Sequence, residues 1–161
     1  MTEKELIVTH LEQGFRRKSW HGTNLLGSLR GLDNQTASWR PAPGRHNIWE
    51  LIVHAAYWKY SVYRRFEGDL KLKFAIPGSD WLERPSATAV GDLKSDVRLL
   101  KTYHDLLIAS IKAFSNNDLG NTPKGSSTTY RDLAMGAAAH DLYHAGQIQL
   151  IKRLYQELGL I

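Results

Sequence analysis

The sequence contains no cysteine among its 161 residues. Disulfide bonds and thiolate metal sites are therefore excluded, and any metal ion must be bound by His, Asp, Glu or similar ligands. No apolar run approaches the ~20 residues that are needed to cross a bilayer. The polar start, residues 1–5, is followed by no apolar segment of the kind found in secretory signals. These absences predict a soluble, cytoplasmic protein with no membrane partner.

The composition is otherwise ordinary, with 42% hydrophobic and 23% charged residues. This length predicts a single domain, residues 1–161, with a sizeable core. The net charge of +5 raises nucleic acid as a partner. However, the basic residues are scattered, acidic residues lie among them, and no recognised nucleic-acid motif is present. We therefore interpret the charge as a solvated basic surface and expect no nucleic-acid binding.

Four segments carry apolar residues at helical spacing. The first runs from about residue 2 to residue 30, with Gly31 placed to end it. The second begins at Asn47, an N-cap that Glu50 completes as a capping box, and stops at Gly68. The pattern predicts that His54 lies on the buried stripe of this second helix.

The third helix is predicted to follow a cap at Ser86 or Thr88 and to end near residues 116–117. The last is capped by Thr129, and its stripe carries both His140 and His144. No segment alternates as a strand would. The sequence therefore predicts an all-α fold, most simply a four-helix bundle.

Three stretches between the helices are predicted to be irregular. Residues 34–45 contain two prolines and a glycine, and residues 121–128 form a polar loop. Residues 69–87 make a long crossover between the second and third helices, broken by prolines. Trp81 is the predicted anchor that ties this crossover to the helices.

His140 and His144 stand four residues apart, so both lie on one face of the last helix. Two imidazoles in an apolar core are unfavourable unless their nitrogens are satisfied, and a metal ion satisfies both. The small residues 136–139 that precede the pair allow either a cavity or close helix packing, and close packing requires no ligand. A lone buried histidine is more often a hydrogen-bonded core residue, but the pair favours a metal site.

The stretch from His140 to His144 also resembles the H-E-x-x-H helix of zinc proteases, with Asp141 in place of the glutamate base. Aspartate is one methylene shorter and reaches a metal-bound water less well. Proteases of this kind take a third ligand from further downstream, where the only acidic residue is Glu157 and no histidine follows. A protease is therefore not expected.

Two motifs together resemble the DinB/YfiT-like superfamily over most of the chain. The first is Trp39-Arg40-Pro41 running into residues 48–54, and the second is His140-Asp141-x-x-His144-x-Gly-Gln-Ile. The resemblance implies a DinB-like four-helix bundle with a long crossover, often assembled as a homodimer. It also implies that His54, His140 and His144 bind a divalent metal ion, commonly zinc or nickel.

Members of this superfamily include S-transferases that use low-molecular-weight thiols such as bacillithiol, mycothiol or glutathione, together with metal-dependent hydrolases and isomerases. Three imidazole ligands leave a coordination position for water or substrate, as in catalytic zinc sites. The resemblance thus favours a metal-dependent enzyme acting on a small molecule, with thiol transfer ahead of hydrolysis. The alternative is a non-enzymatic metalloprotein or stress-related interaction module in which the metal is structural.

Other polar residues have open roles. His104, on the third stripe, is either a further ligand, a hydrogen-bonding partner or base near the site, or, as we favour, a core histidine satisfied by a carbonyl or water. Asp141 either orients a ligand on another helix or lies at the surface, and Gln147 is expected to hydrogen-bond across the bundle. The remaining candidates are pocket or core aromatics and surface histidines: Tyr57, Trp58, Tyr143, His10, His21 and His46.

Overall fold

The computed structural model describes residues 1–84 and 92–159, and all regular structure within these two ranges is helical. The predicted helical fold is thereby confirmed. The elements are α1 (Glu3–Phe15), α2 (Leu25–Ser28), α3 (Asn34–Ser38), α4 (Ile48–Glu67), α5 (Leu93–Ala113), the 3-10 turn η1 (Asn116–Asp118) and α6 (Tyr130–Glu157). None of these helices has the length and apolar character that crossing a membrane requires.

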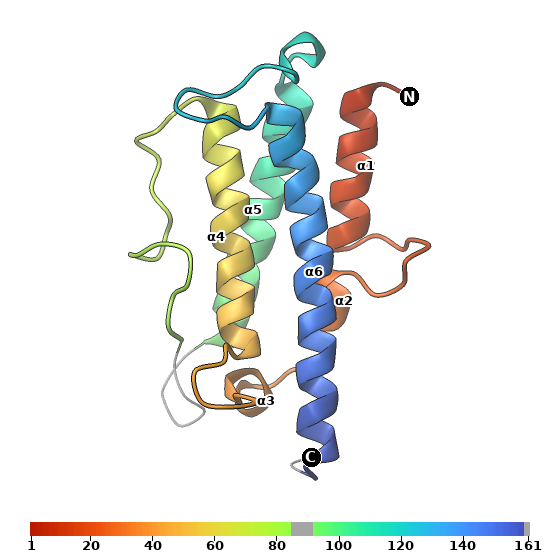
Figure 1. Cartoon of the computed structure of the whole chain (residues 1–161), viewed down its shortest axis with the longest axis vertical. Helices are drawn as coiled ribbons and strands as arrows, with labels where there is room; N and C mark the ends of the chain where they lie inside the picture. Colours follow the sequence, from red (N-terminus) through yellow and green to blue (C-terminus); the bar gives the residue numbers. More distant parts are fainter. Residues whose placement is uncertain (85–91, 160–161) are drawn as a thin grey trace.

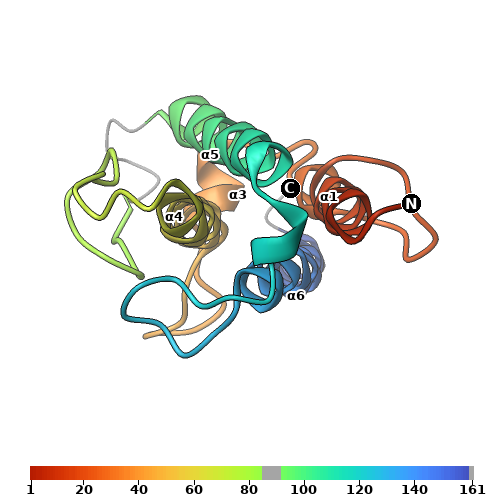
Figure 2. The ribbon, with the colours of Figure 1, turned by 90° about the horizontal axis from the view of Figure 1, so that it is seen from above.

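The long helices α1, α4, α5 and α6 run side by side, as the two ribbon views show (Figures 1 and 2). Helix α4 packs mainly on α5, and α1 packs mainly on α6, while α4 and α6 also contact each other directly. The buried apolar residues form two clusters. Along α6, His140 and His144 lie between Ala138 of one cluster and Ala145 of the other.

Helix α4 begins and ends where the sequence predicts. The Asn47 side chain accepts a hydrogen bond from the Glu50 amide at 2.8 Å, and Glu50 accepts one from the Asn47 amide at 3.3 Å. This reciprocal capping box satisfies two amides that the first turn leaves without helical partners. Gly68 then ends the helix with a φ of 67°, a conformation that glycine adopts without strain. The predicted burial of His54 is also confirmed, since its exposed fraction is 5%.

Helix α6 is capped by Thr129, as predicted, because the hydroxyl oxygen accepts a hydrogen bond from the Asp132 amide at 3.1 Å. Its small residues allow α1 to approach closely. A Cβ atom added to Gly14 of α1 would lie 3.0 Å from the Ala138 carbonyl oxygen. Close packing, one of the two uses expected for residues 136–139, therefore occurs on the α1 side of α6.

The prediction of one helix over residues 2–30 is wrong. Helix α1 ends at Phe15, and the short α2 starts only after a turn in which Gly22 has a φ of 95°. Asn24 starts α2 by accepting a hydrogen bond from the Gly27 amide at 2.8 Å. The helical spacing of apolar residues continues across this break because Leu25 is itself buried in the core.

Two further boundaries differ from expectation. The segment 34–45 contains α3, which starts where the Asp33 carboxylate accepts a hydrogen bond from the Thr36 amide at 2.7 Å. The two prolines come after this helix and leave it intact. Helix α5 starts at Leu93 after Asp92, and the predicted caps Ser86 and Thr88 lie outside the described residues.

Candidate metal centre

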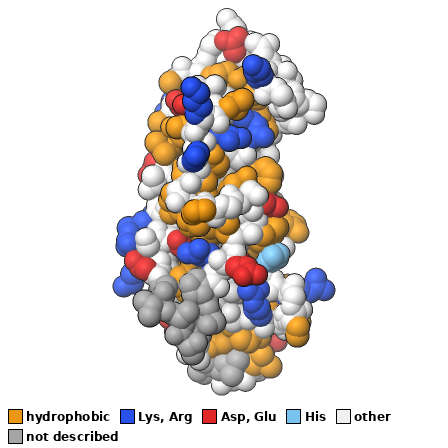
Figure 3. Space-filling model, turned by 90° about the vertical axis from the view of Figure 1, so that its left-hand side faces the viewer, with side chains coloured by type: hydrophobic (Ala, Val, Ile, Leu, Met, Phe, Trp, Pro, Cys, Tyr) orange, Lys and Arg blue, Asp and Glu red, His pale blue; other side chains and the backbone are white. Residues whose placement is uncertain are grey.

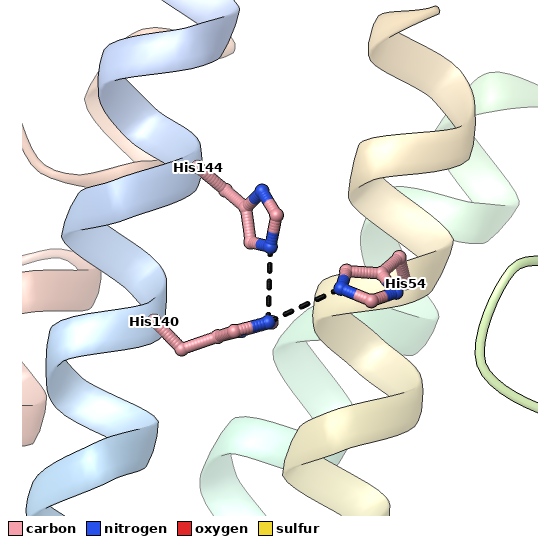
Figure 4. A group of neighbouring side chains, drawn as sticks. All are labelled: His54, His140 and His144. Atoms are coloured by element: carbon pink, nitrogen blue, oxygen red, sulfur yellow. Dashed lines mark hydrogen bonds between the residues drawn. The ribbon is translucent and has the colours of Figure 1, made fainter. Parts of the chain in front are cut away.

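Three histidines converge between α4 and α6 (Figure 4). The Nε2 atom of His140 lies 3.1 Å from Nε2 of His54 and 2.9 Å from Nε2 of His144. His54 and His144 are buried and His140 is half-buried. The structure thus brings together the three residues that the sequence and the resemblance single out, as a group that can hold a metal ion.

The hydrogen bonds of the other ring nitrogens fix how these imidazoles are protonated. Nδ1 of His54 lies 3.2 Å from the Asp80 carboxylate and 3.3 Å from the Asp80 carbonyl oxygen. Nδ1 of His144 lies 2.6 Å from the side-chain oxygen of Gln147. Because all these oxygens are acceptors, both Nδ1 atoms must donate, and each neutral ring then carries a lone pair on Nε2.

His140 Nε2 can donate a proton to only one of its two neighbours, so at least one of the close nitrogen pairs shares no proton. Additional protons are disfavoured, because burial lowers the pKa of all three rings. Burial and then the neighbouring His144 bring the pKa of His140 to about 3, and burial brings that of His144 to about 4. A cation among the three lone pairs removes this conflict.

The spacing of the nitrogens also suits a metal ion. Zinc–imidazole bonds of ~2.0–2.1 Å at tetrahedral angles place two ligand nitrogens about 3.3 Å apart. Two of the observed separations, 3.1 and 2.9 Å, need to widen by only a few tenths of an ångström to match, and the ligand atoms of all three histidines lie within 4.8 Å of one another. The chemistry and the spacing of the donor set therefore both fit a divalent ion.

The segment after α4 closes over His54. Trp81 lies between two imidazoles, stacked on His54 at 3.7 Å and on His46 at 3.6 Å between ring centroids. Asp80 adopts a φ of 58° and accepts a hydrogen bond from the Trp58 indole at 2.8 Å. Trp81 is therefore the anchor that the sequence predicts, and it packs on a residue of the site itself. His46, expected at the surface, is exposed but takes part in this stack.

Beside the histidines, Lys59 of α4 and Asp141 of α6 form a buried ion pair of 2.6 Å. Their side chains are only 2% and 1% exposed. Burial lowers the pKa of Lys59 and raises the pKa of Asp141, and their mutual attraction opposes both shifts. Both roles considered for Asp141 are wrong, because it lies in the interior and its partner is a lysine.

His104 does not join the group of three. It is fully buried, stacks on Phe15 at 3.8 Å between ring centroids, and has no hydrogen-bond partner for either ring nitrogen among the described residues. Burial and then the nearby Lys59 charge lower the pKa of His104 to about 2. Its placement in the core agrees with the favoured prediction, whereas the expected carbonyl partner is absent from the described residues.

Cavities adjoin the histidines on two sides. One of about 260 Å³ reaches His140 and is walled by Trp58, among others. Another of about 440 Å³ reaches His144, with Tyr143 and Gln147 in its wall. Gln147 bonds along its own helix to His144, not across the bundle as predicted. Tyr57 lines a separate cavity beside residues 70–78. The site is therefore open to small molecules from two directions.

Sequence reasoning missed Asp80 and Lys59. Lys59 left a signal, because it stands four residues after Ala55 and three before Val62, on the apolar stripe of α4. A lysine at such a position requires a buried partner. The sequence gives only a weak indication of the role of Asp80, namely its position beside the predicted anchor Trp81. Its contact with His54 depends on the path of an irregular segment, which the sequence does not predict.

The family model of the DinB superfamily matches residues 19–148, a range that includes His54, His140 and His144. No curated protein and no solved structure matches the chain.

Proposed function

The chain belongs to the DinB superfamily, and on that premise we propose that it is a divalent-metal-dependent enzyme acting on a small molecule. In this proposal, His54, His140 and His144 bind one ion, zinc or nickel, through Nε2. The observation that carries it is the convergence of three Nε2 lone pairs, two of them fixed by acceptors at Nδ1. Acceptors of this kind are the usual partners of metal-ligating histidines.

A catalytic role is favoured over a structural one by the number of ligands and by access. Three imidazoles leave one position of a tetrahedral ion for water or substrate, and cavities reach both His140 and His144. When bound, the metal acts as a Lewis acid that lowers the pKa of a coordinated water or thiol. The protein supplies the orientation: Asp80 and Gln147 hold two ligand rings, and Trp81 covers His54.

For the reaction, we propose transfer of a low-molecular-weight thiol first and hydrolysis second, an order that the family resemblance supplies. The cavity on the His144 side suits a polar thiol compound, because its wall contains Arg45, Tyr143 and Gln147. Their guanidinium, hydroxyl and amide groups can bind carboxylate and amide groups of such a molecule. We likewise assign the four long helices and the segment between α4 and α5 to the bundle with long crossover that the resemblance implies.

The experiment that tests this function compares metal-loaded native protein with His54→Ala. Bacillithiol, mycothiol and glutathione are each assayed against 1-chloro-2,4-dinitrobenzene, and 4-nitrophenyl acetate serves as a hydrolysis substrate. We expect the native protein to accelerate thiol transfer and the variant to return the rate to background. Equal thiol-transfer rates in the native protein and His54→Ala would contradict the thiol-transfer proposal. If both reactions run at background while metal loading raises the unfolding temperature, the metal is structural.

A further inference from the structure

The cavity on the His140 side has an apolar wall next to the metal centre. Trp58 and Val62 form one side from α4, and Leu133, Gly136 and Ala137 form the other from α6. We infer that this cavity binds a neutral, ring-sized apolar part of the substrate whose reacting group lies at the metal. The inference rests on the proposed function, and it adds a substrate class to it.

The cavity lies directly beside the proposed metal site. His140 lies in its wall, and the Trp58 ring centroid is 6.3 Å from that of His140 and 6.4 Å from that of His54. The Trp58 indole is held in place by its hydrogen bond to Asp80, the residue that also orients His54. A molecule bound at the histidines can therefore extend directly along the Trp58 face.

The two acidic and basic side chains in the cavity wall, Lys59 and Asp132, already have partners. The Lys59 ammonium lies 2.6 Å from Asp141, so only its aliphatic stem is available to a ligand. The Asp132 carboxylate accepts a hydrogen bond of 2.7 Å from the Thr129 hydroxyl and lies at the exposed start of α6. Among the described residues that line the cavity, no cationic side chain is without a partner. The cavity therefore suits an uncharged group of the substrate better than an anionic one.

The size of the cavity sets the size of the group. Its volume is about 260 Å³, whereas an apolar cavity of roughly 150 Å³ accepts benzene. A substituted ring or a branched alkyl group therefore fits.

Exposed hydrophobic side chains also lie around the middle and upper part of the molecular face in Figure 3, and Trp58 itself remains 38% exposed.

Gly136 keeps part of this space open. Among the described residues, a Cβ atom added there meets no atom within 4 Å beyond the neighbouring turns of its own helix, so packing between helices does not require glycine at this position. Glycine is unfavourable in a helix interior relative to alanine. Gly136 instead leaves space in the cavity wall for the apolar group of the substrate. A larger side chain at residue 136 would fill that space.

The test uses cobalt-loaded protein, whose visible absorption reports a thiol at the metal. Benzyl mercaptan carries the apolar ring, and 2-mercaptoethanol is the probe without it. We expect benzyl mercaptan to bind at least about tenfold more tightly, as burial of its ring predicts. Gly136→Leu should abolish this preference and leave 2-mercaptoethanol affinity within about twofold. The matched control is Gly146→Leu, at another exposed α6 glycine with open space around its added Cβ.

Val62→Phe fills the cavity from α4 and serves as a second variant if Gly136→Leu does not fold. Equal affinities for the two thiols, or a ring preference that survives both filling variants, overturn the apolar subsite and leave the metal centre intact. Loss of the preference in Gly146→Leu also overturns it, because that change lies outside the cavity. Failure of native protein to bind cobalt overturns the proposed function and the subsite with it.

Discussion

Lys59 of α4 and Asp141 of α6 form an ion pair inside the protein, one residue along α6 from His140. The pair joins the two helices that carry the histidines, so it fixes their separation at the level of the site. Removing one partner leaves the other charge buried without compensation, which costs about 3–5 kcal/mol in comparable pairs. Replacing both partners with apolar residues avoids that penalty.

We therefore expect Lys59→Met and Asp141→Leu each to lower the free energy of unfolding by about 3–5 kcal/mol. The double variant should recover most of this loss, giving a large coupling energy in a double-mutant cycle. Urea unfolding of metal-free protein at pH 7 measures all four states. Single variants that lose less than about 1 kcal/mol would contradict the buried-pair account.

Asp80 should tune metal affinity through His54. Asp80→Asn keeps an acceptor for Nδ1 but removes the charge, and we expect metal affinity to fall by about tenfold. Asp80→Gly removes the carboxylate and tolerates the φ of 58°, and the loss should reach about a hundredfold. Competition with a chromophoric chelator measures both. The control is Asp69→Asn, in the same segment, whose carboxylate accepts a hydrogen bond only from the Lys71 amide among the contacts described. A matching loss in the control would argue against a specific role for Asp80.

His104 should reduce stability and have no part in metal binding. Neither buried ring nitrogen has a hydrogen-bond partner among the described residues, and Nε2 comes no nearer than 3.7 Å to the Glu12 carboxylate. His104→Leu is therefore expected to stabilise the protein by about 1–2 kcal/mol at pH 7. This gain in stability should grow as the pH falls below 6.5, the ordinary pKa of histidine. In that range His104 binds a proton in the unfolded chain but stays neutral in the folded protein, where its pKa is about 2.

At pH 5 this linkage adds about 2 kcal/mol to the gain. Chemical unfolding of native and His104→Leu protein at pH 5 and pH 7 provides the comparison, and metal affinity should be the same in both. A variant that loses metal would make His104 part of the site after all.

Gly14 is required by the close approach of α1 to α6. We expect Gly14→Ala to lower stability by about 1–2 kcal/mol, although alanine favours helix, because its Cβ meets the Ala138 carbonyl at 3.0 Å. Gly136→Ala is the matched comparison on α6, where the new Cβ meets nothing, and it should raise stability by about 0.5–1 kcal/mol. Thermal unfolding distinguishes the two. Equal stabilisation by both changes would mean that the helices are further apart than described.

The sequence predicts those parts of the fold that depend on nearby residues. The capping box of Asn47 and Glu50, the Thr129 cap and the glycine that ends α4 are local features, and all three are confirmed. The sequence pattern does not predict the break after Phe15, because apolar spacing continues through Leu25, although three cations and Gly22 interrupt the segment. Periodicity reports which residues are buried and does not report whether the chain between them is continuous.

In the candidate site, too, the sequence predicts the residues that follow a local pattern and does not predict those that depend on distant contacts. The histidine pair on α6 is readable from an i,i+4 spacing, and His54 from its buried stripe together with the family resemblance. The roles of Asp80 and Asp141 depend on contacts between segments 26 and 82 residues apart in sequence. No local pattern encodes such contacts, so the groups that orient and flank the histidines became visible only in the folded chain.

In the proposed site, His54, His140 and His144 together bind one divalent ion. The most direct measurement is the metal content of tag-free protein after loading with zinc or nickel and removal of excess ion. We expect one ion per chain in the native protein and in the exposed-histidine control His10→Ala, and little or none in His54→Ala, His140→Ala and His144→Ala. Native protein without bound metal, or His144→Ala with full occupancy, would contradict the claim.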